Sequence, residues 1–359
     1  MKKLLNILLL TALLGADKPV LTNEEIASNL LEHMSLEQKV AQMFIVRTTA
    51  ITADMDLALH PVGGYCLFAY DIENPQQLKH LTDSLQNALF SPLLCIDEEG
   101  GRVARIAGND AFDVPRFPNM GKMVEAGTTP VGEASFAIGS YLKEYGFNVD
   151  FAPVADVFTN PLNTVIGQRA LSTSAEEATR LVPEYMEGLR KAGIVPCVKH
   201  FPGHGDTIAD SHHGCASVSK DWEQMLQCEI LPFKAAIDAG VPIVMVAHVS
   251  APEVTGDNLP ATLSEQMITG KLKGELGFKG IVITDSMAMG AVSKEYDSAQ
   301  AAVMAVKAGV DIVLMPADFI MAYNGLLAAV ESGEISLSRI EESVYKILML
   351  KLECGAIKL

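Results

Sequence analysis

Short apolar runs alternate with amphipathic helical patterns along most of this chain, and this alternation limits the possible folds more than any other feature. The runs that read as buried strands are 43–47, 62–69, 92–97, 147–154, 194–200, 243–248, 280–285 and 311–315. Helical patterns lie between most of them, for example at 75–89, 175–192, 223–239, 264–276, 298–308 and 320–332. About eight strands that alternate with helices predict an α/β fold, a (β/α)8 TIM barrel in a single domain. A doubly wound open sheet is the alternative, but no GxGxxG motif follows the first run.

Helix signals mark the two ends of this predicted domain. Capping boxes at 22–25 and 35–38 predict that two helices begin there, ahead of the first strand. A last helical pattern, at 337–352, repeats apolar residues on one face, and we expect it to pack on the barrel and close its core. The domain is therefore predicted to span residues 22–356.

Residues 1–16 have the layout of a secretory signal peptide. Lysines at positions 2 and 3 precede an apolar stretch at 4–14, which is followed by the small residues Gly15 and Ala16. The stretch is short for a membrane span. We expect the leader to be removed and the protein to be exported, periplasmic or secreted. The alternatives are a non-cleaved anchor or merely an apolar start, and a cytoplasmic location for the protein.

Charge and cysteine usage limit the partners and the compartment. A formal net charge of -17 repels nucleic-acid phosphates and anionic lipids, so we expect a soluble protein with neither kind of partner. We also expect a monomer. No stable membrane span is expected once the leader is removed. The cysteines argue mildly against export, because several read as buried thiols and not as a disulfide framework: Cys66, Cys95 and Cys197.

The segment 199–213, KHFPGHGDTIADSHH, carries half of the 8 histidines and follows a strand-like run. Its spacing matches no tetrahedral zinc pattern and no cysteine pair lies nearby, so a metal site is disfavoured. A structural loop is a second interpretation, and an active-site loop is the one we favour. Within it, the Asp210 carboxylate can fix the tautomer of His212 and raise the basicity of its other ring nitrogen. His212 is therefore a candidate general acid/base.

Polar and charged residues collect where the other predicted strands end, the edge that carries chemistry in a TIM barrel. Five of them have the donors and acceptors to hold a polyhydroxylated ligand such as a sugar: Asp97, Arg105, Arg169, Lys199 and His200. Asp285 ends the apolar run 281–283, where an ionised carboxylate can attack an anomeric carbon. Capping of the following helix is the structural alternative for Asp285.

Four motifs together resemble family 3 glycoside hydrolases, most closely the bacterial β-N-acetylglucosaminidases of the NagZ type. They are KHFPGHG followed by DSH, IDEEGGRVAR, NPLNTVIGQR and VITDSMAMGAV, and the resemblance runs from about position 35 to the final helix. It implies a single-domain barrel that needs no metal or cofactor and removes terminal N-acetylglucosamine, with retention, from peptidoglycan fragments.

The resemblance also implies roles for individual residues. Asp285 corresponds to the catalytic nucleophile, and His212 to the general acid/base with Asp210 as its partner. The sugar-binding positions correspond to Asp97, Arg105, Arg169, Lys199 and His200. Other functions remain open at this stage: a family 3 β-glucosidase, a glycoside phosphorylase, a wall-fragment sensor without catalysis, and a metal-dependent hydrolase.

Overall fold

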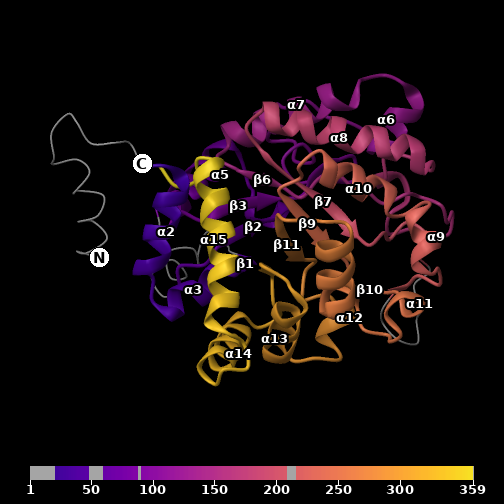
Figure 1. The fold of residues 1–359 in the computed structure, drawn as a ribbon. Coiled ribbons are helices and arrows are strands. Elements are labelled where there is room, and N and C mark those ends of the chain that lie inside the picture. The colour runs from indigo at the N-terminus through magenta and orange to yellow at the C-terminus, as the bar shows by residue number, and fades with distance from the viewer. Residues whose placement is uncertain (1–20, 48–59, 88–89, 208–215, 359) are drawn as a thin grey trace.

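A parallel barrel forms the centre of the molecule in the computed structural model, which describes residues 21–47, 60–87, 90–207 and 216–358 (Figure 1). Its strands are β1 (Phe44–Arg47), β2 (Gly64–Leu67), β3 (Leu93–Ile96), β6 (Val149–Asp150), β7 (Val195–Phe201), β9 (Ile243–Val246), β11 (Ile281–Thr284) and β12 (Val313–Leu314). The 8 strands lie in the order β11-β9-β7-β6-β3-β2-β1-β12, and a parallel bridge between Ile283 and Ile312 closes the ring. The predicted (β/α)8 barrel is confirmed.

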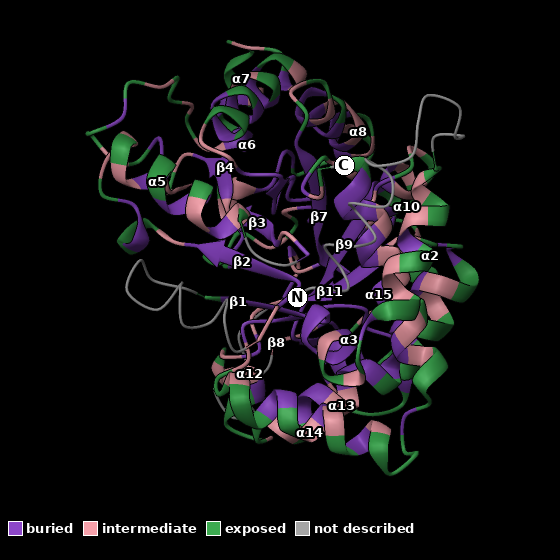
Figure 2. Cartoon of the chain, turned by 90° about the vertical axis from the view of Figure 1, so that its left-hand side faces the viewer, coloured by how far each residue is buried: buried purple, intermediate pink, exposed green. Residues whose placement is uncertain are grey.

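Helices surround the strands with their buried faces toward the barrel and their exposed faces outward, as Figure 2 shows. They are α2 (Asn23–His33), α3 (Leu36–Gln42), α5 (Pro75–Gln86), α6 (Met120–Ala126), α7 (Val131–Glu144), α8 (Ala175–Lys191), α9 (Trp222–Leu226), α10 (Leu231–Asp238), α11 (Pro252–Thr255), α12 (Gly290–Ser293), α13 (Ser298–Ala308), α14 (Phe319–Glu331) and α15 (Leu337–Glu353). Both predicted capping boxes are present, at Thr22 and at Ser35. No helix in the described part of the chain is long and apolar enough to cross a membrane.

Three helical regions differ from the sequence-based expectation. The range 223–239 is two helices, because Pro232 lacks an N–H and stands at the start of α10. The range 264–276 contains a π-helix, η4 (Gln266–Glu275). Helices α6 and α7 lie outside the predicted ranges.

In the contact between α7 and α8, a Cβ on Gly188 would meet Ser135 Oγ at 1.9 Å, so glycine here permits close approach of the two helices.

Helix α15 closes the N-terminal end of the barrel, as predicted for 337–352. Its Ile347 and Leu350 join the apolar cluster inside the ring of strands. The neighbouring Lys351 is fully buried, and its Nζ donates to Gln42 Oε1 at 2.6 Å and to the carbonyl of Phe90 at 3.0 Å. The opposite, C-terminal end of the barrel is left for the candidate site.

Candidate active site

Strand alternation brings the charged residues of the site into the mouth of the barrel. Side chains two positions apart share a face of a strand, so residues that follow an interior position by two also point inward. Cys95, Cys197 and Ile283 belong to the interior cluster. Asp97 and Lys199 each lie two positions beyond one of these residues, and so does Asp285 beyond Ile283. The three predicted strand-end residues therefore meet at one end of the barrel.

Asp97 is held between two cations at this mouth. Its Oδ1 accepts from Lys199 Nζ at 2.7 Å, and its Oδ2 pairs with Arg105 Nη2 at 3.3 Å. Burial alone would raise the pKa of Asp97, but the Lys199 ammonium holds it below its ordinary value. Asp97 is thus kept ionised as a hydrogen-bond acceptor.

Glu99 links Lys199 to Arg169 and is a site residue that the sequence did not single out. Lys199 Nζ lies 2.6 Å from Glu99 Oε1. Arg169 donates to both carboxylate oxygens of Glu99, from Nε at 2.9 Å and from Nη2 at 2.8 Å. Although burial opposes ionisation, Lys199 and Arg169 lower the pKa of Glu99 to about 2. Lys199 is correspondingly held charged, since Asp97 and Glu99 outweigh its burial and raise its pKa.

Glu98 holds the backbone that carries Arg105. Strands β4 (Glu98–Gly100) and β5 (Val103–Ala104) form an antiparallel hairpin directly after β3. The Glu98 carboxylate accepts from the backbone N–H groups of Arg105 at 2.5 Å, Ile106 at 2.9 Å and Ala107 at 2.8 Å. The Tyr141 hydroxyl also donates to it, at 2.9 Å. The position of the Arg105 side chain therefore depends on a fully buried carboxylate behind it.

His200 is oriented by Asp156 in the same mouth. Its Nδ1 lies 2.7 Å from Asp156 Oδ2, and Arg169 Nη2 donates to its Nε2 at 3.4 Å. The backbone N–H of His204 also donates to Asp156, at 2.6 Å. Burial would raise the pKa of Asp156, but the interaction with His200 keeps it below its ordinary value. Because a carboxylate only accepts, Nδ1 carries the proton and Nε2 faces the Arg169 side.

Asp285 stands at the end of β11, on the far side of the mouth from the hairpin. Its Oδ1 accepts from the backbone N–H of Ser286 at 2.7 Å. The next helix, α12, has Met289 as its N-cap residue, so Asp285 does not cap it. The adjacent His248 is buried, which lowers its pKa, and its Nε2 lies 2.8 Å from the carbonyl of Ser286. Asp285 is thus partly exposed on a loop whose backbone is tied to β9.

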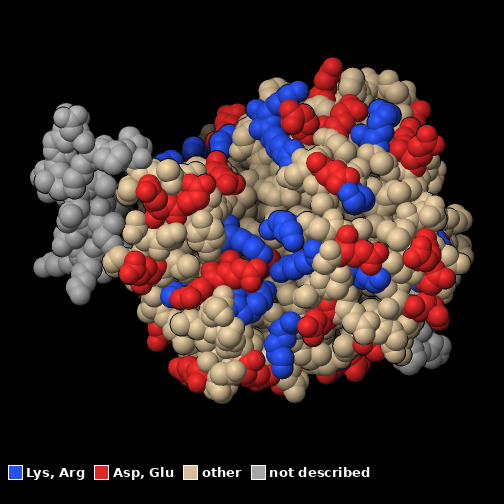
Figure 3. Space-filling model, viewed as in Figure 1, with Lys and Arg blue, Asp and Glu red and all other residues tan. Residues whose placement is uncertain are grey.

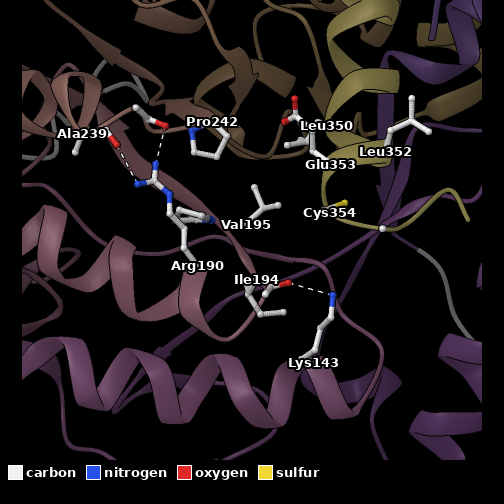
Figure 4. Close-up of a pocket in the computed structure, with 14 residues that line it drawn as sticks. Lys143, Arg190, Ile194, Val195, Ala239, Pro242, Leu350, Leu352, Glu353 and Cys354 are labelled. Atoms are coloured by element: carbon white, nitrogen blue, oxygen red, sulfur yellow. Dashed lines mark hydrogen bonds between the residues drawn. The ribbon is translucent and has the colours of Figure 1, made fainter. Parts of the chain in front are cut away.

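A separate cavity of about 740 Å³ lies at the N-terminal end of the barrel, away from these residues (Figure 4). Its two cations are occupied by backbone carbonyls: Lys143 Nζ donates to Gly193 at 3.1 Å, and Arg190 donates to Ala239 at 2.9 Å and Gly240 at 2.6 Å. These contacts fix loops that lead into strands. We therefore place the candidate site at the C-terminal mouth.

Comparison with known proteins assigns the family. Residues 35–350 match the model described as the glycosyl hydrolase family 3 N terminal domain. The chain belongs to glycosyl hydrolase family 3. A Beta-hexosaminidase A from Pseudoalteromonas piscicida is 34% identical over an alignment of 322 residues, with 82% of this chain and 54% of that protein covered. A Beta-hexosaminidase from Nitrosomonas eutropha is 32% identical over an alignment of 320 residues, with 85% of this chain and 90% of that protein covered.

A solved structure gives the same assignment. The family 3 beta-N-acetylglucosaminidase from Paenibacillus sp. str. FPU-7 superposes with a TM-score of 0.84 at 39% identity, over 91% of this chain and 65% of that one. This family 3 chain therefore spans about half of the Pseudoalteromonas relative and about two thirds of the Paenibacillus one.

The structure brings together six of the eight predicted site residues of this family 3 domain. Asp97, Arg105, Arg169, Lys199 and His200 form one connected network, and Asp285 faces the same mouth. Asp210 and His212 lie outside the described residues, as does the predicted leader at 1–16. Within the ranges that are described, no group of three or more His, Cys, Asp or Glu side chains is placed to hold a metal ion.

Proposed function

We propose that this chain is a retaining β-N-acetylhexosaminidase that hydrolyses non-reducing terminal N-acetylglucosamine. The observation that carries the proposal is the partly exposed Asp285 carboxylate, at one mouth with a charged network of hydroxyl-binding side chains. The names of the family 3 relatives supply the acetamido sugar.

In the proposed mechanism, the network positions the sugar. Asp97 is ionised and accepts hydrogen bonds from ring hydroxyls, while Lys199 and Arg105 donate to them. Arg169 and His200 stand next to this group and bind the remaining polar atoms of the terminal sugar. Since the buried carboxylates Glu98 and Glu99 hold these cations in place, little reorganisation is needed when the substrate arrives.

The chemistry proceeds through Asp285 and the His212/Asp210 pair. The Asp285 carboxylate attacks the anomeric carbon and forms a glycosyl ester as the bond to the leaving oxygen breaks. His212, poised by Asp210, gives its proton to that oxygen. The imidazole then takes a proton from the water that attacks the anomeric carbon, which releases the sugar with retained configuration and frees Asp285.

The proposed substrates are peptidoglycan-derived fragments that end in N-acetylglucosamine. We propose that the protein is a monomer and that its leader directs export, so that it meets such fragments outside the inner membrane. Figure 3 shows Lys, Arg, Asp and Glu side chains interspersed on the face it presents, without a large area of a single sign.

Hydrolysis of 4-nitrophenyl N-acetyl-β-glucosaminide, compared with the matching glucoside, tests the proposal. Asp285→Asn keeps the shape of the side chain but removes the nucleophile, and we expect kcat to fall roughly 10⁴-fold. Full activity in this variant would place the nucleophile elsewhere. Preference for the glucoside would indicate a β-glucosidase instead, and dependence of product release on phosphate would indicate a phosphorylase.

The acid/base role is tested by His212→Gly, with His213→Gly as the matched control at the next position. Aryl leaving groups need little protonation, so His212→Gly should slow cleavage of N,N′-diacetylchitobiose far more than cleavage of the 4-nitrophenyl glycoside. The control should not separate the two substrates. Equal loss on both substrates in His212→Gly would contradict the assignment.

A further inference from the structure

An exposed aromatic ring stands beside the site and takes no part in the network described above. Among the large hydrophobic side chains that are exposed in the described ranges, two are aromatic: Tyr70 at 61% and Phe136 at 47%. Phe136 lies on helix α7, away from the mouth. Tyr70 lies in a short 3-10 turn, η1 (Ala69–Asp71), that follows β2 at the C-terminal end of the barrel.

The Tyr70 ring is held in one orientation. It stacks on Phe68 with the ring centroids 5.5 Å apart and the planes parallel to within 1°. Arg47 Nη1 donates to the Tyr70 hydroxyl at 3.3 Å, and the turn is tied by Asp71, whose Oδ2 accepts from the backbone N–H of Phe68 at 2.9 Å. Phe68 therefore backs part of one face of Tyr70 in an offset stack, while most of the side chain stays in contact with solvent.

Phe68 connects this ring to the network that we propose holds the terminal sugar. It lies two residues beyond the interior Cys66 and packs on the interior cluster, so it forms part of the mouth. Strands β2 and β3 pair with Leu67 opposite Ile96, so that Phe68 and Asp97 leave neighbouring strands at the same level.

Arg105 completes the connection. Its guanidinium carbon lies 5.5 Å from the centroid of Phe68, and its Nη2 binds Asp97. The Phe68 ring thus lies between the two groups, 5.5 Å from the Tyr70 ring and 5.5 Å from the guanidinium carbon of Arg105. Tyr70 is thereby placed one aromatic ring away from the side chains that we propose hold the terminal sugar.

We propose that Tyr70, backed by Phe68, binds the leaving-group sugar by stacking on the apolar face of its pyranose ring. A tyrosine loses little side-chain entropy when it becomes a contact surface, and here the ring is already oriented. Its hydroxyl stays on Arg47 while the ring offers an apolar face at the edge of a polar mouth. The proposal rests on the proposed hydrolase function and adds a preference for substrates with a second sugar ring.

The test compares N,N′-diacetylchitobiose, which carries a sugar leaving group, with methyl N-acetyl-β-glucosaminide, which does not. Tyr70→Ala should lower kcat/KM for the disaccharide about 5- to 10-fold, in proportion to a lost ring-stacking contact. Its kcat/KM for the methyl glycoside should stay within about twofold of wild type. Tyr70→Phe keeps the ring and should stay close to wild type on both, as should the remote control Phe136→Ala. Equal losses on the two substrates, or no loss on the disaccharide, would overturn the proposal.

A binding measurement separates this inference from the function on which it rests. If the wild type cleaves neither glycoside, the proposed hydrolase activity has failed, and calorimetric titration with N,N′-diacetylchitobiose then decides the subsite. About 5- to 10-fold weaker binding to Tyr70→Ala than to wild type would support it. Equal affinity of the two proteins, or absence of binding to the wild type, would overturn it.

Discussion

Replacement of Glu99 by glutamine should cost about 3 kcal/mol of folding free energy at neutral pH. Glutamine keeps the shape of the side chain, but its neutral amide no longer forms the ion pairs that Glu99 makes with Lys199 at 2.6 Å and with Arg169 at 2.8 Å. The pKa of Glu99 falls from its ordinary value of 4.5 to about 2. At about 1.4 kcal/mol for each pKa unit, this difference corresponds to roughly 3 kcal/mol. Removal of one partner from other buried ion pairs costs about 3–5 kcal/mol, which agrees.

The pH dependence gives the sign of the effect. The folded state holds Glu99 ionised more firmly than the unfolded state, so its contribution is fully present above pH 4.5 and is lost as the pH falls toward about 2. Urea unfolding of wild type and Glu99→Gln should therefore differ by about 3 kcal/mol at pH 7. The difference should shrink as the pH falls through that window.

An exposed pair provides the matched control for this experiment. Lys79 and Asp83 lie 2.7 Å apart on helix α5, with side chains that are 50% and 62% exposed. Asp83→Asn should change the free energy of unfolding by less than about 1 kcal/mol. The reasoning is refuted if Glu99→Gln is as stable as this control at pH 7, or if its deficit does not change with pH.

Two further variants test Asp156, which orients His200 in the site, and Lys351, which is buried at the floor of the barrel. In Asp156→Asn the amide oxygen keeps the hydrogen bond from the His204 N–H, so the amide NH2 group faces His200 Nδ1 and favours the opposite tautomer. We expect kcat/KM for 4-nitrophenyl N-acetyl-β-glucosaminide to fall about 10-fold or more, and an unchanged value in the folded variant would rule out this positioning role. Burial lowers the pKa of Lys351 from 10.5 to about 7, so the wild type gains stability as the pH rises across that interval. Lys351→Met lacks this pH-dependent gain. Urea unfolding should show that its free energy of unfolding, relative to that of the wild type, falls by roughly 2–5 kcal/mol between pH 7 and pH 10.5. A difference that does not vary with pH would contradict the lowered pKa.

Three of the site residues predicted from sequence have a position that follows from a single strand. Asp97, Lys199 and Asp285 end apolar runs, and the period of two is enough to bring them to one edge of the barrel. Glu99 was not predicted as their partner, because the β4–β5 hairpin reverses the chain and turns a nearby residue back onto Lys199. The only available signal was its place in a run of three carboxylates at 97–99.

Asp156 illustrates the same limit over a longer distance. The sequence places it after a strand, but its bond to His200 spans 44 positions and depends on the pairing of β6 with β7. Strand order is a tertiary property that local periodicity does not contain. Gly132 and Gly139 weaken the helical signal of α7, although a Cβ at Gly139 would meet Ala192 Cβ at 2.7 Å, so the contact with the end of α8 requires glycine there. The roles of Asp210 and His212 stay predictions from the sequence.

The closure of the barrel by α15 has a consequence for how the protein is made. Lys351 Nζ bonds to Gln42 across 309 positions, and Ile347 and Leu350 fill the floor of the barrel. During synthesis the first strands leave the ribosome long before the helix that seals them. The apolar interior face of β1 therefore stays exposed at the N-terminal end of the barrel until α15 has emerged. A nascent chain stalled before α15 should be open to proteases and chaperones even when all of its strands are already outside the exit tunnel.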